Sequence, residues 1–270
     1  MNLILVGPGR AGMSVALRCV ASGHRLVGVL ARRPDAAEEA AARLGTGPLE
    51  WDADLPPADL ALLAVADDAI AGVAGRLAPV AGALEGAVHL SGLVSVSALA
   101  PLERVCPTGS FHPLQTLPDP DLGASLLEGC WVAITAADPI AGRLESLAVS
   151  IGAYPFRLPD AAKPIYHAAA SAAANFPVAA LALSRRLFQA AGVDFAVAGP
   201  LIRGAICGAM ALGPEAAITG PVARGDLGTV AAQLAAVQDA APDELEDFRA
   251  MARVVARAAG SARLVREVLE

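Results

Sequence analysis

The sequence predicts an α/β protein with two domains: a doubly wound α/β domain over residues 1–158 and an all-α domain over residues 159–270. Three observations predict this fold class. A glycine-rich turn separates an apolar run from a helical pattern near the N-terminus. Strand and helix patterns then alternate as far as residue 158, which is typical of a parallel sheet covered by helices. From Pro159 onward the strand patterns stop, and long segments rich in Ala and Leu follow.

The first element is an apolar, β-branch-containing strand over residues 2–6, followed by the turn Gly7-Pro-Gly-Arg-Ala-Gly12. Residues 13–21 then predict a helix and residues 24–31 a second strand. In such a unit the first glycine allows the tight turn, the second lets the backbone approach a pyrophosphate, and the third lets helix and strand pack closely. We therefore expect a dinucleotide at the start of the helix, contacted by Gly7, Gly9, Arg10, Ala11 and Gly12.

Two adjacent arginines follow the second strand, at a place where NAD-binding domains carry an acid for the ribose hydroxyls. The strand ends in Ala31-Arg32-Arg33-Pro34 and offers no carboxylate there. Guanidinium groups grip a phosphate through paired hydrogen bonds. We expect Arg32 and Arg33 to bind a 2′-phosphate, so that the cofactor is NADP(H), although Arg33 could instead simply face water at the start of the next helix.

The alternation continues with strands over residues 59–65, 86–90, 105–111, 131–136 and 153–157, and with helices over residues 36–44, 67–77 and 140–151. Ligands of doubly wound sheets bind beyond the carboxyl ends of the strands. Several polar residues follow strand ends in this way, and we expect the cofactor to contact Ala66, Asp67, Ser91 and Gly92. Ser91 and Gln115 are expected to contact the substrate.

The second half predicts helices over residues 163–191, 195–212, 227–240 and 243–269, with Asp226 and Asp243 as N-caps. Of the 20 basic residues, Lys163 is the only lysine. Arginine cannot replace an ammonium group that must shift its pKa or act as a compact donor. Because one of the two tyrosines, one of the four histidines and one of the two asparagines lie within residues 163–175, we interpret this segment as functional.

Positions 163, 167, 171 and 175 share one helix face, which carries Lys163, His167, Ser171 and Asn175. This polar row on an Ala-rich helix predicts a wall that faces a cleft. The turn Thr219-Gly-Pro-Val-Ala-Arg-Gly-Asp226 presents Arg224, which could hold a substrate carboxylate or serve only a cap or salt bridge. His112 could act on the substrate or cap backbone in its loop.

The glycine turn, Ser110-Phe-His-Pro-Leu-Gln-Thr116, Lys163-Pro-Ile-Tyr-His167 with Asn175, and the turn ending in Asp226 occur in one order along the chain. Together they resemble a Rossmann-like oxidoreductase family with a C-terminal helical domain of formerly unknown function. It is similar to the 6-phosphogluconate dehydrogenase-like superfamily, which includes pyrroline-5-carboxylate reductase, ketopantoate reductase and prephenate dehydrogenase. Relatives with a catalytic Lys carry Asn four residues later, where this chain has His167.

The resemblance implies a nicotinamide-dependent oxidoreductase with its site between the domains. We expect an NADPH-dependent reductase of a small carbonyl or imine compound that bears a carboxylate, for example a ketopantoate-like 2-oxo acid. Lys163, His112 and His167 would be catalytic, with Lys163 donating the proton, and Asn175 and Arg224 would bind substrate. Alternatives are a non-catalytic NADP(H)-binding sensor or scaffold, and a prephenate-dehydrogenase-like oxidative enzyme with His112 as base.

The amino-acid composition argues against several other classes of protein. The net charge of −7 and the 4% of aromatic residues argue against a nucleic-acid surface. The apolar stretches are interrupted by polar residues, Pro or Gly, so no membrane span is expected, and no export signal is evident at the start. The four cysteines lie far apart, which predicts reduced thiols in the cytoplasm and no metal site. We expect a homodimer through the apolar helical domain.

Overall fold

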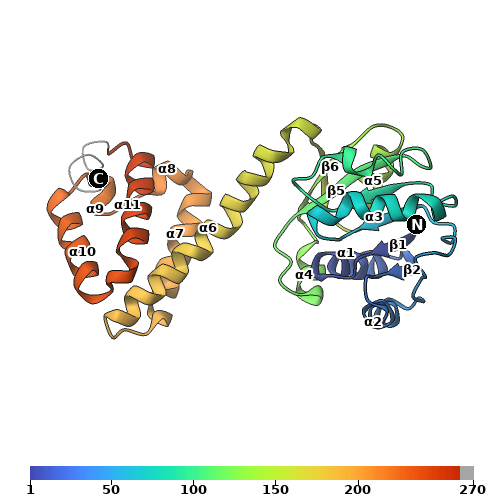
Figure 1. Ribbon diagram of the computed structural model, residues 1–270. Coiled ribbons are helices and arrows are strands. Elements are labelled where there is room, and N and C mark those ends of the chain that lie inside the picture. Colours follow the sequence, from blue (N-terminus) through green and yellow to red (C-terminus); the bar gives the residue numbers. More distant parts are fainter. Residues whose placement is uncertain (262–270) are drawn as a thin grey trace. The chain divides into compact units, whose positions relative to one another are not determined.

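A computed structural model of the chain describes residues 1–261 and confirms the predicted fold class. The chain divides into two compact units, Met1–Ser171 and Ala172–Glu270. All strands belong to the first unit, and the described part of the second unit is helical (Figure 1). The division falls inside a helix, whereas the sequence placed the boundary between residues 158 and 159.

The first unit is built on a seven-stranded sheet in the order β2-β1-β3-β4-β5-β6-β7. Strands β1 to β5 are parallel, β6 pairs antiparallel with β5, and β7 is parallel to β6. Leu114 at the end of β5 pairs with Trp131 at the start of β6. The connection between them therefore returns to the same edge of the sheet instead of crossing over it. The strands are β1 Asn2–Val6, β2 Arg25–Leu30, β3 Leu60–Leu63, β4 Ala87–His89, β5 Thr108–Leu114, β6 Trp131–Ala136 and β7 Tyr154–Arg157.

Both faces of the sheet are buried, as the period-2 alternation of a strand shows in β1. Leu3 and Leu5 pack into the cluster that contains residues of α1, whereas Ile4 and Val6 pack into the cluster that contains residues of α3. All four side chains are fully buried. The helices of this unit are α1 Arg10–Ala21, α2 Pro34–Leu44, α3 Ile70–Leu77, α4 Pro120–Leu126 and α5 Ile140–Ser150.

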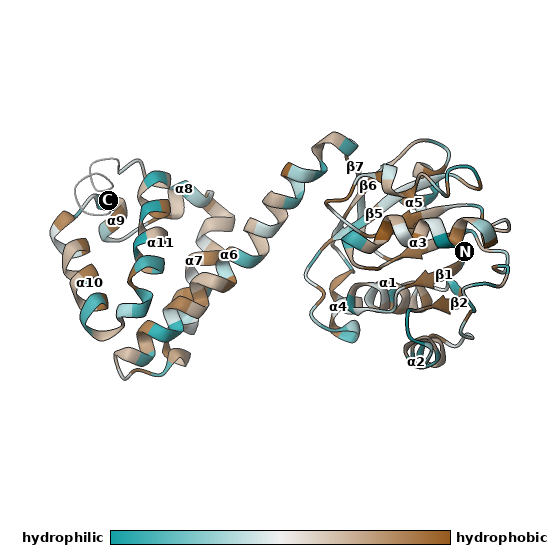
Figure 2. Ribbon diagram, viewed as in Figure 1, coloured by the Kyte–Doolittle hydropathy of each residue, from teal (hydrophilic) through white to brown (hydrophobic). Residues whose placement is uncertain are grey.

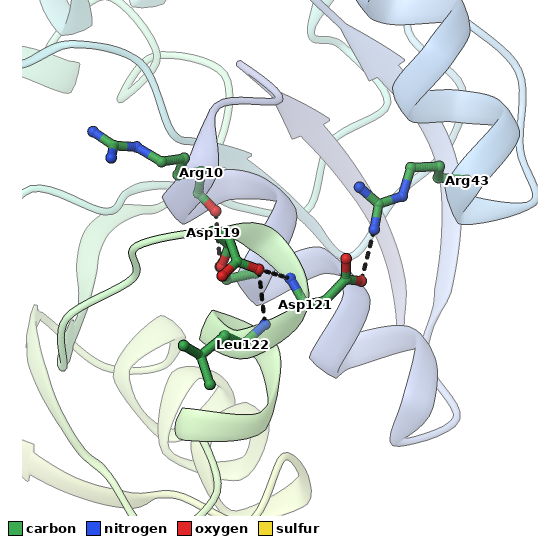
Figure 3. Close-up of polar contacts among 6 residues, drawn as sticks. Arg10, Arg43, Asp119, Asp121 and Leu122 are labelled. Carbon is green, nitrogen blue, oxygen red and sulfur yellow. Dashed lines mark hydrogen bonds and ion pairs between the residues drawn. The ribbon is translucent and has the colours of Figure 1, made fainter.

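Helix α4, which the sequence pattern did not predict, packs against α1 (Figure 3). The side chain of Asp119 caps α4 by accepting two N–H groups of its first turn, each at 3.0 Å. The Ser14 hydroxyl contacts the carbonyl of Asp119 at 3.4 Å, and Asp121 pairs with Arg43 of α2 at 2.7 Å. At Gly123 a Cβ atom would lie 2.1 Å from Ser14 Oγ, so this close packing requires glycine.

The second unit begins within α6, and the first turns of this helix belong to the first unit. Asp226 caps α10 as predicted, since its carboxylate accepts the Thr229 N–H at 3.0 Å. The helix expected over residues 243–269 corresponds to α11. The part of this expected range beyond residue 261 lies outside the described residues. The helices are α6 Lys163–Ala190, α7 Gly199–Leu212, α8 Pro214–Ala217, α9 Pro221–Arg224, α10 Leu227–Ala240 and α11 Leu245–Ala258.

Candidate functional site

The glycine turn connects β1 to α1 in the arrangement that the sequence predicted. Gly7 has φ +95°, and a Cβ atom there would lie 2.8 Å from the Ala64 carbonyl oxygen. A Cβ atom on Gly12 would lie 2.3 Å from the Gly7 carbonyl oxygen, whereas one on Gly9 would meet nothing within 4 Å. No side chain caps the start of α1. The turn is therefore closely packed on its inner side and open at Gly9, where uncapped N–H groups can face an anion.

A cavity of about 670 Å³ opens beside this turn. It is lined by Gly7 and Gly9, by the predicted arginine pair Arg32 and Arg33, by residues 64–66 that follow β3, and by residues of α3. No acidic residue is among those of the described chain that line it. The lining residues thus fit a nucleotide with an additional phosphate, and Arg10, Ala11 and Asp67 are exposed at the nearby starts of α1 and α3.

Lys163 is the first residue of α6 and is only 1% exposed. Its Nζ donates to the Ser91 carbonyl oxygen at 2.9 Å and to Ser110 Oγ at 2.8 Å. Burial lowers the pKa of Lys163 to about 8, although the charges of Asp160 and Asp67 act in the opposite direction. A side chain that water cannot reach is also out of reach of a substrate. In this conformation the ammonium group therefore joins α6 to the loop after β4 and to β5.

The loop after β4 is fixed around Ser91. Its N–H lies 3.2 Å from His89 Nδ1, its carbonyl accepts Lys163, and its hydroxyl oxygen accepts the N–H groups of Leu93 at 3.1 Å and Val94 at 3.0 Å. Both lone pairs of that oxygen are used, so Ser91 can offer a ligand only its hydroxyl proton. Gly92 follows it and is buried.

His89 is fully buried in β4. Burial, together with the charge of Lys163, lowers the pKa of His89 to about 4, so the ring is neutral at pH 7. Within residues 1–261 its Nε2 has no partner with hydrogen-bond geometry, although an interaction with the backbone of Ser95 acts to raise the pKa of the ring. The neutral ring thus accepts the Ser91 N–H at Nδ1 and carries its proton on Nε2.

His112, Tyr166 and His167 form a second group beside this loop. His112 Nδ1 lies 2.9 Å from Tyr166 Oη, and the ring centroids of His112 and His167 are 6.2 Å apart. A Cβ atom on Gly92 would lie 2.7 Å from the His112 ring, so only glycine permits this contact. Burial, then the charge of Lys163, lowers the pKa of His112 to about 4, and burial raises the pKa of Tyr166 to about 12. Both groups are therefore neutral near pH 7.

Tyr166 was not among the predicted site residues. The signal for it was present, because it is one of only two tyrosines in the chain and lies three residues after the single lysine. What the sequence could not show is its partner: β5 brings His112 to the first turn of α6 from 54 residues away.

The remaining predicted residues lie elsewhere. Gln115 is exposed, and its side-chain amide contacts the Leu126 carbonyl at 3.3 Å and the Thr116 N–H at 2.8 Å, so it shapes its own loop. Asn175 is exposed on α6, and Arg224 is the last residue of α9; both belong to the second unit. Their roles in substrate binding stay predictions. Among the described residues no group of three or more His, Cys, Asp or Glu could hold a metal ion.

We expect the free energy of unfolding to fall between pH 6.5, the ordinary pKa of histidine, and pH 4. His89 and His112 have pKa values of about 4 in the folded chain. Over this range the unfolded chain therefore binds protons that the folded chain does not, at a cost of up to about 1 kcal/mol per pH unit for each histidine. Urea unfolding at about pH 7, 6 and 5 measures the loss. His112→Gln cannot titrate and should flatten the dependence; an unchanged slope would contradict a neutral His112.

The comparisons with known proteins agree with this fold. Residues 130–255 match the family described as Domain of unknown function (DUF2520). No curated protein matches the chain significantly. Similar solved structures include a provisionally named NADP oxidoreductase from Bacteroides fragilis, which is 22% identical, covers 95% of this chain and 98% of that chain, and has a TM-score of 0.79.

An imine reductase from Streptomyces aurantiacus is 17% identical, covers all of both chains and has a TM-score of 0.64. A reductive aminase from Aspergillus terreus, solved with NADPH and ethyl levulinate, is also 17% identical, covers 97% of this chain and 94% of that chain, and has a TM-score of 0.64. Identities this low show a shared fold. Residues 130–255 of the chain are thus similar to the DUF2520 family, and the chain shares a Rossmann-like fold with oxidoreductases of known structure, as the resemblance implied.

Proposed function

We propose that the protein is an NADP(H)-dependent oxidoreductase that reduces a small carbonyl or imine compound bearing a carboxylate. The observation that carries the proposal is the cavity beside the glycine turn, which combines an open, uncapped helix start with Arg32 and Arg33 and has no acid among its described lining residues. Negative charge is favoured at a helix start, and paired guanidinium groups favour a phosphate.

The similar structures support the direction of the reaction. The Streptomyces protein is named an imine reductase, and the Aspergillus protein is named a reductive aminase and was solved with NADPH. Reduction of a C=N or C=O bond needs a hydride on carbon and a proton on nitrogen or oxygen. Bound NADPH would supply the hydride, so the residues of this chain must orient the substrate and supply the proton.

Tyr166 is the residue best placed to supply that proton. It is partly exposed, protonated at pH 7 and within hydrogen-bond distance of His112 Nδ1. If His112 carries its proton on Nδ1, it donates to the phenol oxygen and leaves the phenol proton free for the substrate. The tyrosinate left after transfer would accept that same hydrogen bond until solvent returns a proton. His167, beside His112, would orient the substrate.

Lys163 would act without touching the substrate. The hydrogen bonds of its ammonium group fix the loop at Ser91, and its positive charge helps to keep His112 neutral. The same charge would stabilise a tyrosinate at Tyr166. This assignment differs from the direct proton transfer expected from the sequence, because a residue with 1% exposure cannot meet a substrate in this conformation.

The burial of Lys163 also favours a second candidate, a non-catalytic NADP(H)-binding sensor or scaffold. In such a protein the buried ammonium group would serve only to join α6 to the sheet. The cofactor cavity would be unchanged, so cofactor binding supports both candidates and only turnover separates them.

We also propose that a second copy of the chain covers the apolar surface of the second unit. Residues Phe195–Leu212 have a mean hydropathy of 1.6, and only 6% of this stretch is buried. By length and composition alone, the stretch is apolar and long enough to cross a membrane. Figure 2 shows apolar residues along α6 and α7, and Leu201 and Met210 are 71% and 85% exposed. Large exposed apolar patches mark interaction surfaces. The free cysteines, of which Cys19, Cys106 and Cys130 are buried, fit the reducing cytoplasm.

Cofactor preference tests the proposal first. We expect NADPH to bind at least tenfold more tightly than NADH, measured by titration calorimetry. Arg33→Ala should weaken NADPH binding about tenfold and leave NADH binding within twofold, because only NADPH carries the 2′-phosphate. Arg25→Ala, at the other end of β2, is the matched control and should change neither affinity. Equal or tighter binding of NADH by the native chain would defeat the proposal.

Turnover is tested by following NADPH absorbance with 2-oxo acids, ketopantoate and cyclic imines. For whichever compound is reduced, Tyr166→Phe should lower kcat about 100-fold and leave NADPH affinity unchanged, because it removes the proton donor alone. Tyr154→Phe changes the other tyrosine, which is exposed on β7, and should retain the native rate. Full activity of Tyr166→Phe would refute the role of the phenol. Tight NADPH binding without oxidation of any compound would favour the sensor.

Light scattering after gel filtration tests the second copy. We expect a mass of twice 27.1 kDa. The double variant Leu201→Asp with Met210→Asp should give a monomer, because charges at an apolar interface are costly to bury. A monomeric native protein that instead floats with lipid vesicles would show that a membrane covers this surface.

A further inference from the structure

Trp51 and Arg76 form one end of the cofactor cavity. Neither residue was predicted from the sequence to contact the cofactor. Both residues line the cavity, and Trp51 is its only aromatic residue in the described chain. The Arg76 guanidinium lies over the Trp51 ring, 4.6 Å from the centroid. Trp51 Nε1 donates to the Ala31 carbonyl oxygen at 2.7 Å, which ties the ring to the residue just before Arg32. The pair therefore stands next to the arginines proposed for the 2′-phosphate.

We propose that Arg76, held on the Trp51 ring, and the face of α3 that Gly72 exposes form the subsite for the adenine base of the dinucleotide. This inference rests on the proposed cofactor and goes beyond it by assigning the base to residues that the phosphate arguments leave out. A purine is flat and stacks on guanidinium planes and aromatic rings.

Helix α3 presents two distinct faces. Ile70, Ala74 and Leu77 are fully buried in the hydrophobic cluster that also contains Ile4 and Val6 of β1. Gly72, Val73 and Arg76 lie on another face of α3, which Ala69 continues just before the helix, and all four residues line the cavity. A Cβ atom on Gly72 would meet nothing within 4 Å. The backbone at Gly72 therefore borders open space, which a flat base can fill.

The present partners of Arg76 do not hold it firmly. Its guanidinium is 3.6 Å from Asp52, whose side chain is 91% exposed, and such surface pairs contribute little. Arg33 is held in a similar way, 3.5 Å from the exposed Asp35. Arg76 can therefore turn one guanidinium face to a base while its other face remains on Trp51. The 2′-phosphate would stay with Arg32 and Arg33, at the end of β2.

Gly72 and Gly75 provide a matched pair for the test. Both lie within α3, both are exposed, and a Cβ atom on either would meet nothing within 4 Å, but only Gly72 lines the cavity. Gly72→Leu should weaken binding of NADPH, NADH and adenosine 2′,5′-bisphosphate at least tenfold, because its side chain takes the place of the base. Gly75→Leu should bind all three within twofold of the native chain. Leucine favours a helix more than glycine does, so both variants should fold, and thermal melting checks this.

Arg76→Ala distinguishes the base from the 2′-phosphate. A guanidinium that stacks on adenine serves both dinucleotides, so affinity for NADPH and for NADH should fall by the same factor, about fivefold. A loss confined to NADPH would place Arg76 on the phosphate and overturn the assignment.

Trp51 supplies a readout that needs no turnover. In a Trp131→Phe background Trp51 is the only tryptophan, and adenosine 2′,5′-bisphosphate should change its emission by altering the cation over its ring. In a Trp51→Phe background the emission of Trp131 should not change.

The outcomes distinguish a failure of the adenine subsite from a failure of the proposed function. Native affinity for NADPH in Gly72→Leu, or an unresponsive Trp51, would overturn the adenine subsite and leave the proposed cofactor standing. If the native chain bound neither NADPH nor the bisphosphate, the proposed function would fall and the subsite with it.

Discussion

The arrangement of α6, β5 and the loop after β4 in the first unit depends on one buried cation, the ammonium group of Lys163. An ammonium group without water is costly unless acceptors surround it, and the acceptors of Lys163 come from the loop after β4 and from β5. This requirement fixes the first turn of α6 against the carboxyl ends of the strands. It also fixes the neighbours of the ammonium group, because His89 and His112 are buried close to a positive charge and are kept neutral by both effects. A neutral imidazole can accept or donate at Nδ1, which is what the contacts with Ser91 and Tyr166 need.

The same edge of the sheet carries two kinds of chemistry, and packing keeps them apart. At β1 and β2, glycines remove side chains where atoms would collide, and arginines supply charge that is loosely held by exposed carboxylates. At β4 and β5, the polar groups are tied to one another: the Ser91 hydroxyl oxygen is filled by two N–H groups, and Lys163 is enclosed. The first region can rearrange around a ligand at little cost. The second is preorganised, as a site must be when it acts through orientation.

The parts of this structure that local rules govern were predictable from the sequence. The Gly7–Gly12 turn needs only local backbone geometry, and the parallel order of β1 to β5 follows from the alternation of patterns. Lys163 stood out as the only lysine among 20 basic residues, and its segment also contained Tyr166. The direction of β6 was not predictable, because whether a connection crosses a sheet depends on packing such as Gly123 against Ser14. Sequence reasoning also expected Lys163 to donate a proton directly to the substrate, because spacing places a residue on a helix face but does not say what covers that face. Trp51 and Arg76 are 25 positions apart in segments without a motif, so only the folded chain joins them.

The division of labour between the units has a consequence for how substrate and cofactor are selected. Within the described residues, those that line the cavity and those that form the hydrogen bonds of Lys163, His112 and Tyr166 all belong to Met1–Ser171. Asn175 and Arg224, the expected substrate ligands, belong to the other unit. If the proposed function holds, changes in the helical unit would alter the substrate while the proposed nucleotide contacts and the proposed proton donor stay intact. Proteins of this fold named for different substrates, at identities as low as 17%, are what such a separation permits. The residues that line the cavity come from the loops after β1, β2 and β3, from the helices beside them and from the segment that contains Trp51, all within the first unit, so the nucleotide contacts can persist while the helical unit varies.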